Sequence, residues 1–230
     1  MGYIQCTADE RAFGYCVFCG RELTTRDHCP SIILLDEPYP DDLPVVPACL
    51  KCNSSFSLDE EYLACLVACV LAGTTDPEKI QREKIKLILQ RKQALRTRLE
   101  QSVTMECGNV TFSIEADRVG AVITKLARGH AFYELHEHCL DEPAIIQCLP
   151  LDRMMPHEKQ TFENPPAPTL CPEIGSRAMH RMLIVDNGSQ IFHDWITIQN
   201  GMYRYHASLS NNIHIRIVIQ DYLACDVIWE

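Results

Sequence analysis

The chain has 230 residues, of which 47% are hydrophobic and 23% are charged, so it can bury a sizeable core. It contains no apolar run of the roughly 18 residues that a membrane span needs, and its first ten residues, MGYIQCTADE, lack the basic and apolar blocks of a secretory signal. The formal net charge of −10 argues against a protein that coats DNA over its whole surface.

The chain holds thirteen cysteines, a high number for this length. Because no export signal is evident, we expect a cytoplasmic protein with reduced thiols rather than a disulfide framework. Two pairs share the CxxC spacing, Cys16 with Cys19 and Cys49 with Cys52. Each pair can present two thiolates from one tight turn, and two such turns complete the tetrahedral shell of a structural Zn²⁺ ion. This closed site should clamp the segment between the pairs and do no chemistry.

After the second pair the pattern becomes helical. SLDEEYLACLVACVLAG starts at Ser57, an expected N-cap, and stops at Gly73, an expected terminator. We predict a helix over residues 58–72, in which Cys65 and Cys69 are core residues rather than ligands.

A second helix is predicted from Asp76 and Pro77 to about residue 101, because proline is favoured in a first helical turn. This segment is strongly basic. Two interpretations stay open, a solvated helix that packs one edge on the protein or a direct contact with nucleic acid. Its basic residues are Lys79, Arg82, Lys84, Lys86, Arg91, Lys92, Arg96 and Arg98.

The second half reads as a strand over 109–114, a helix over 115–137, and an irregular proline-rich connection over 141–178. The last fifty residues are rich in β-branched and alternating stretches, namely RMLIVD, DWITIQ, MYRYHAS, IHIRIVI and DVIW. Asn200-Gly201 is a strong hairpin signal. Alternation places Ile213, Ile215, Ile217 and Ile219 on one face, which indicates an antiparallel sheet with one dry face. The predicted fold class is therefore α+β.

RDHCPSIIL, residues 26–34, sets Asp27 beside His28 between the two cysteine pairs. Alone, this stretch is typical of a turn. Held by zinc, however, Asp27 and His28 would face Asn53, which directly follows Cys52. Carboxylate and amide oxygens suit a hard cation such as Mg²⁺, and a histidine beside such an ion can take a proton from water. This set predicts metal-assisted phosphodiester hydrolysis.

CVFCGRELTTRDHCP followed by LPVVPACLKCNSSFSLDEEY resembles the HNH endonuclease family, a ββα-metal finger with a zinc-stabilised subtype, over residues 13–65. The resemblance implies a DNA endonuclease in which His28 is the general base and Asp27 and Asn53 hold one Mg²⁺ or Mn²⁺ ion. It implies products with a 5′ phosphate and a 3′ hydroxyl. KLARGHAFYEL and YRYHASLS resemble uncharacterised bacterial proteins that carry this module, which suggests an effector of anti-phage defence or a part of a mobile element.

The sequence departs from the family pattern in two regions. Leu43, Pro44 and Val45 stand where the family has its middle asparagine, and Ser57 stands where it has a late histidine. The competing prediction is therefore a catalytically decayed zinc module that binds nucleic acid or a protein. A third is a nuclease that stays idle until a partner, such as an ATPase or sensor, supplies DNA.

The expected organisation is an HNH module over 1–73, a basic helical connector over 74–103, and an α+β domain over 104–230 whose antiparallel sheet packs with a helix. Other candidates are weaker. We expect Cys29 to be a buried thiol, although a place near the metal or a redox role is open. No HExxH motif and no P-loop occur, so neither a zincin nor an ATPase is predicted. The remaining groups are a histidine-rich helix end (His130, Glu134, His136, Glu137, His138, Cys139) and a possible sheet surface (Tyr203, Arg204, Tyr205, Arg216).

Overall fold

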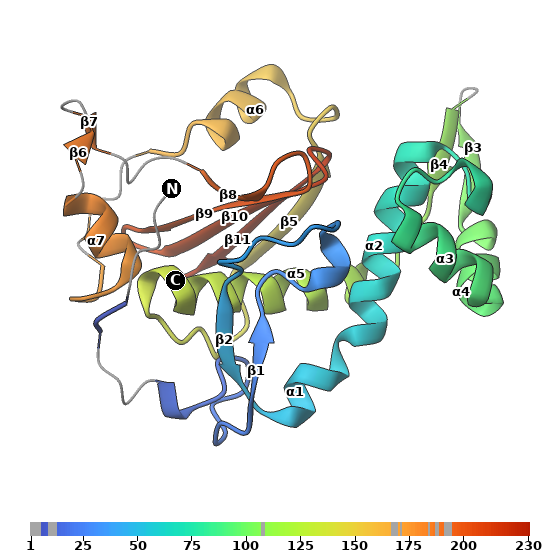
Figure 1. Ribbon diagram of the computed structural model, residues 1–230. Coiled ribbons are helices and arrows are strands. Elements are labelled where there is room, and N and C mark those ends of the chain that lie inside the picture. Colours follow the sequence, from blue (N-terminus) through green and yellow to red (C-terminus); the bar gives the residue numbers. More distant parts are fainter. Residues whose placement is uncertain are drawn as a thin grey trace. The chain divides into compact units, whose positions relative to one another are not determined.

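The computed structural model describes residues 6–8, 13–106, 109–166, 170, 172–183, 185–186, 189–190 and 195–230 (Figure 1). These residues form helices and antiparallel sheets, so the predicted α+β class is confirmed. The chain divides into two compact units, one of Met1–Ser55 with Ile123–Glu230 and the other of Phe56–Val122. The domain boundaries expected after residues 73 and 103 both fall inside the second unit. No helix among the described residues combines the length and apolar character that crossing a bilayer requires.

The first unit is built on a five-stranded antiparallel sheet with the order β5-β11-β10-β9-β8. The predicted turn at Asn200-Gly201 joins β8 to β9, and Gly201 takes the left-handed φ of 73° that favours glycine there. The strands are β5 (Ile145–Pro150), β8 (Ile196–Gln199), β9 (Tyr203–Leu209), β10 (Ile213–Ile219) and β11 (Leu223–Trp229).

Both faces of this sheet are covered, on opposite sides, by α5 (Ala116–His130) and α6 (Pro156–Glu163) (Figure 1). Three of the four predicted isoleucines, Ile215, Ile217 and Ile219, are fully buried as expected. The expectation of only one dry face is wrong, because Phe162 of α6 packs on Val218 of the other face in a second apolar cluster.

The proline-rich connection is more regular than predicted, since it contains both β5 and α6. Proline occupies the first turn of α6, where its missing N–H costs nothing. RMLIVD is only partly a strand, because α7 (Arg177–Leu183) includes its first three residues before β6 (Val185–Asp186) pairs with β7 (Ser189–Gln190). Ile184 and Asp194, inside two predicted strands, lie outside the described residues.

The helix predicted over 115–137 is present as α5 but changes its winding near the end. Residues Ala131–Leu135 form a π-helical turn, and His136 ends it in the left-handed region with φ of 65°. Such π-turns insert one residue into a helix and redirect the side chains that follow.

A small hairpin and helix in the first unit carry the candidate site. The hairpin consists of β1 (Thr25–His28) and β2 (Val45–Ala48), which pair antiparallel with Asp27 opposite Val46. The short helix α1 (Leu50–Ser55) follows directly. This ββα order is the arrangement that the resemblance predicted for residues 13–65.

The second unit begins with α2 (Ser57–Ala72), which confirms the helix predicted over 58–72. Gly73 ends it in the left-handed region as expected, although the N-cap is Phe56 rather than Ser57. Cys65 and Cys69 are both fully buried, which confirms them as core residues.

The prediction of a single helix that reaches residue 101 is wrong. The segment breaks into a 3-10 turn, η3 (Pro77–Lys79), and two helices, α3 (Glu83–Arg91) and α4 (Gln93–Gln101), before the hairpin of β3 (Val103–Glu106) and β4 (Asn109–Phe112). Arg82 is extended and buried, and Lys92 leaves helical geometry between α3 and α4. The hydrophobic pattern could not reveal these two breaks because neither contains glycine or proline.

Four of the eight basic residues of this segment form ion pairs with acidic side chains of the same unit. This pairing favours the interpretation of a solvated helix over a bare nucleic-acid surface, since the cations are already partly neutralised. The pairs are Lys86–Glu78, Lys92–Glu61, Arg96–Glu100 and Arg98–Glu115.

Candidate metal centre and active site

The four predicted zinc ligands come together in the first unit. The ligand atoms of Cys16, Cys19, Cys49 and Cys52 all lie within 4.8 Å of one another. The Sγ atoms of Cys19 and Cys49 are 3.7 Å apart, close to the edge of about 3.8 Å expected for a tetrahedron with Zn–S bonds of about 2.3 Å. The four cysteines are therefore close enough to hold a metal ion such as zinc.

Local backbone geometry shapes both ligand turns. In the first, the Gly20 N–H donates to the Cys16 carbonyl (2.8 Å), and Gly20 takes a left-handed φ of 69°. In the second, the Cys52 N–H donates to the Cys49 Sγ (3.5 Å), and this backbone hydrogen bond is the main reason that the pKa of Cys49 falls to about 7. Burial raises the pKa of Cys16. One thiolate is thus favoured before metal arrives, while binding the ion must deprotonate the others.

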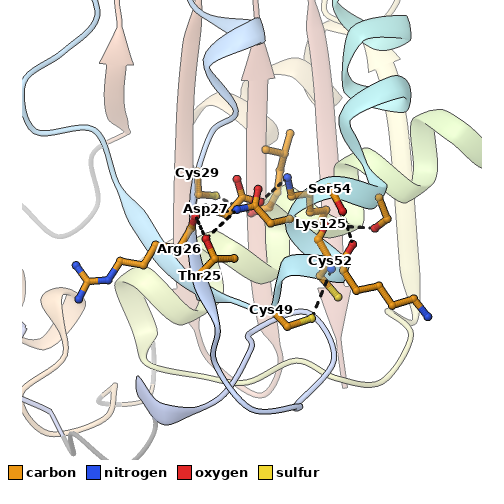
Figure 2. Close-up of polar contacts among 12 residues, drawn as sticks. Thr25, Arg26, Asp27, Cys29, Cys49, Cys52, Ser54 and Lys125 are labelled. Carbon is orange, nitrogen blue, oxygen red and sulfur yellow. Dashed lines mark hydrogen bonds and ion pairs between the residues drawn. The ribbon is translucent and has the colours of Figure 1, made fainter.

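Asp27 lies on the inner face of β1 and meets a residue that the sequence did not single out. Lys125 of α5 places its Nζ 2.7 Å from the Asp27 Oδ2, and the two side chains are only 2% and 11% exposed (Figure 2). The same Nζ lies 5.5 Å from the ring centre of Phe18, between the first two cysteines. A buried ammonium is costly unless it is paired, so this contact joins α5 to the hairpin and the zinc turn.

Asn53 anchors α1 to the same strand. Its Nδ2 donates to the Arg26 carbonyl (2.9 Å) and, at a longer distance, to the Thr25 Oγ1 (3.4 Å). The side-chain amide nitrogen of Asn53 is therefore already hydrogen-bonded to Arg26, the residue before Asp27. This leaves the Asn53 Oδ1 as the atom that could serve a cation or a water molecule.

His28 is exposed and points to the other side of the hairpin. Burial alternates along β1, with Thr25 and Asp27 partly buried and Arg26 and His28 exposed. Neighbouring side chains of a strand leave opposite faces. The structure thus brings Asp27 and Asn53 to neighbouring places on the inner side, while His28 and Arg26 share the outer side. The expectation that His28 faces Asn53 together with Asp27 is therefore wrong, because neighbouring residues of a strand leave opposite faces.

Cys29 is buried, as predicted, and donates to the Leu126 carbonyl (3.4 Å). The Cys29 Sγ also lies 3.6 Å from the Nε2 atom of His130. His130 is fully buried, its ring stacks on that of Tyr205, and its Nε2 is 2.7 Å from the Tyr203 hydroxyl. Burial lowers the pKa of His130 to about 3. His130 is therefore a neutral core histidine.

The remaining candidates do not form sites. Among the described residues, the four cysteines are the one group of histidines, cysteines and acids placed to share an ion, so the cluster at 136–139 is not a metal site. The possible sheet surface is also absent, because Arg204 is bound by Glu163 through two hydrogen bonds of 2.9 Å, and Tyr205 is buried on the opposite face.

Lys125 could have been noticed in the sequence. It stands alone as a charge inside the apolar run AVITKLA, residues 121–127, and a lone lysine in a buried helix face needs an acidic partner. The sequence does not say which acid, because the pairing joins segments far apart in the chain.

Comparisons with known proteins leave the family open. No protein-family model matches the chain, and neither a curated protein nor a solved structure matches it. The likeness to HNH endonucleases thus stays a prediction from the motifs.

Proposed function

We propose that the zinc-clamped ββα module is a metal-dependent DNA endonuclease that hydrolyses phosphodiester bonds. One observation carries the proposal: the cluster that suits zinc lies at the base of a hairpin that bears Asp27 and an exposed His28, with Asn53 hydrogen-bonded to the same strand. A role in anti-phage defence, with an ATPase or sensor as partner, extends this proposal by the same resemblance.

The side chains have distinct roles in this proposal. His28 is open to solvent, so it can take the proton from a water molecule that attacks phosphorus. Arg26 shares the outer side with His28 and can bind a phosphate oxygen, so the phosphate must extend from this side to the ion on the inner side for these groups to act together. Asp27 and Asn53 offer the oxygen types that Mg²⁺ or Mn²⁺ prefers. When bound, such an ion stabilises negative charge on the phosphate and the leaving oxygen.

The ligand atoms of Asp27 and Asn53 suit a hard cation, whereas the net charge around them suits a cation only in part. The Asp27 Oδ2 already faces the Lys125 ammonium. One carboxylate, one ammonium and one neutral amide leave the inner side of β1 without net charge.

Cleavage of supercoiled plasmid by the full-length, zinc-loaded protein in Mg²⁺ or Mn²⁺ tests the proposal. We expect nicks that DNA ligase reseals without prior phosphorylation, because the ends should be a 5′ phosphate and a 3′ hydroxyl. His28→Ala and Asn53→Ala should lose the activity. His214→Ala, which changes a partly exposed histidine of β10, should keep it. Equal nicking by wild type and His28→Ala would reject the proposal.

A second candidate is a zinc module that binds nucleic acid or a protein without hydrolysis. The Lys125–Asp27 contact favours it, because an ammonium already neutralises the carboxylate that an ion would need. In this case the protein would shift DNA in a gel, and Arg26→Ala would weaken the shift, while no nicking would occur in either metal.

A further inference from the structure

We infer that Lys125 makes divalent-ion binding at Asp27 conditional on the anionic substrate, so that metal and a phosphodiester bind together. This inference rests on the proposed function. It assigns a regulatory, positioning role to a residue of α5 that lies outside the stretch resembling the nuclease family.

The geometry restricts where an ion can bind. The Lys125 Nζ is 2.7 Å from the Asp27 Oδ2, and its side chain is 2% exposed, so the ammonium is shielded from water at this point (Figure 2). Asp27 therefore offers an incoming ion its other oxygen, Oδ1. Any ion on this carboxylate shares it with a fixed positive charge.

The charges decide whether that sharing is favourable. Repulsion between two cations a few ångströms apart is weakly screened when one of them is buried. Asn53 is neutral, and the outer-face residues Arg26 and His28 bring no negative charge. Since Lys125 balances Asp27, an ion would enter a site with no charge of its own. A phosphodiester supplies one negative charge and so lowers the net charge of the occupied site from +2 to +1, the value that an ion on Asp27 alone would have.

Lys125 also holds the carboxylate in place. Its Nζ lies against Phe18 of the first cysteine turn as well as against Asp27. The ammonium therefore fixes one carboxylate oxygen while it opposes a bare ion. If no ion binds at Asp27, the ammonium does only the first, and this difference can be measured.

The test is Mn²⁺ binding, followed by electron paramagnetic resonance of the free ion, to the full-length protein with zinc bound. Dimethyl phosphate, a phosphodiester monoanion, serves as the substrate probe. The variants are Lys125→Met, which removes the charge at similar size, and Lys125→Arg, which keeps it. Lys86→Met is the matched control, since it removes an ion-paired lysine of the second unit, whose partner is Glu78. Asp27→Asn defines the binding that depends on this carboxylate.

We expect wild type to bind Mn²⁺ weakly and to bind it more tightly when dimethyl phosphate is present. Lys125→Met should bind Mn²⁺ at least about tenfold more tightly without dimethyl phosphate, and dimethyl phosphate should then add little. Lys125→Arg and Lys86→Met should behave as wild type. Should Lys125→Met not fold, Lys125→Gln is measured in its place with the same expectation.

Unchanged or weaker Mn²⁺ binding by the uncharged variants would overturn the inference while the proposed nuclease stood. Absence of any Asp27-dependent Mn²⁺ binding, with or without dimethyl phosphate, would overturn both the inference and the metal assignment. Tighter binding in Lys125→Met together with no plasmid cleavage would support the inference and reject the nuclease.

Discussion

The contact between Asp27 and Lys125 should contribute strongly to the stability of the first unit. With the two side chains 11% and 2% exposed and 2.7 Å between Nζ and Oδ2, neither charge has ready access to water once its partner is gone. Asp27→Asn strands the more deeply buried charge, so we expect a loss of about 3 kcal/mol of unfolding free energy. Lys125→Met leaves the more accessible carboxylate and should cost about 2 kcal/mol.

The double variant is the informative one. Asp27→Asn with Lys125→Met leaves no unpaired charge, so its cost should be about 2 kcal/mol rather than the sum of the two, which gives a coupling of about 3 kcal/mol. Urea unfolding followed by tryptophan fluorescence suits the measurement, because both tryptophans, Trp195 and Trp229, belong to the first unit. Additive costs, with coupling below about 0.5 kcal/mol, would refute the ion pair as a stabilising contact.

Three further predictions concern the core around the site. Zinc analysis should find about one ion per chain, and Cys49→Ser should lose it whereas Cys148→Ser, which changes a thiol of β5, should not. Because burial lowers the pKa of His130 from 6.5 to about 3, the unfolded chain binds a proton in that range that the folded chain does not. Stability should therefore fall as pH drops from 6.5 to 3, by up to about 1.4 kcal/mol per pH unit, and urea midpoints of His130→Gln should depend less on pH. Gly129→Ala should destabilise by about 2 kcal/mol, since its Cβ would lie 2.5 Å from the Cys29 Sγ, and thermal unfolding should show partial rescue by Cys29→Ala.

Local patterns in the sequence predicted those parts of the fold that depend on neighbouring residues. The CxxC spacing predicted each ligand pair, Cys16 with Cys19 and Cys49 with Cys52, because each pair lies in one local turn, and the four thiols do come together. The Asn200-Gly201 signal likewise marked the connection between β8 and β9, in which residues 200–202 link the paired residues Gln199 and Tyr203.

Features that depend on distant partners were missed. β5 lies in a proline-rich stretch and becomes a strand by pairing with β11, near the end of the chain. The inward direction of Asp27 and the outward direction of His28 follow from the register of β1 on β2 and from the packing of α5, which adjacency in sequence does not reveal. Lys125 escaped notice for the same reason, because its role depends on Asp27, an acid far earlier in the chain.

The central claim, that His28 is the base in phosphodiester hydrolysis, is tested most directly by chemical rescue. Because His28 is exposed on β1, His28→Gly should open a place that free imidazole can enter from solvent. We expect His28→Gly to nick supercoiled plasmid at least about a hundredfold more slowly than wild type, and added imidazole to restore part of the rate without affecting wild type. A variant that nicks at the wild-type rate, or one that is slow and insensitive to imidazole, would contradict the account.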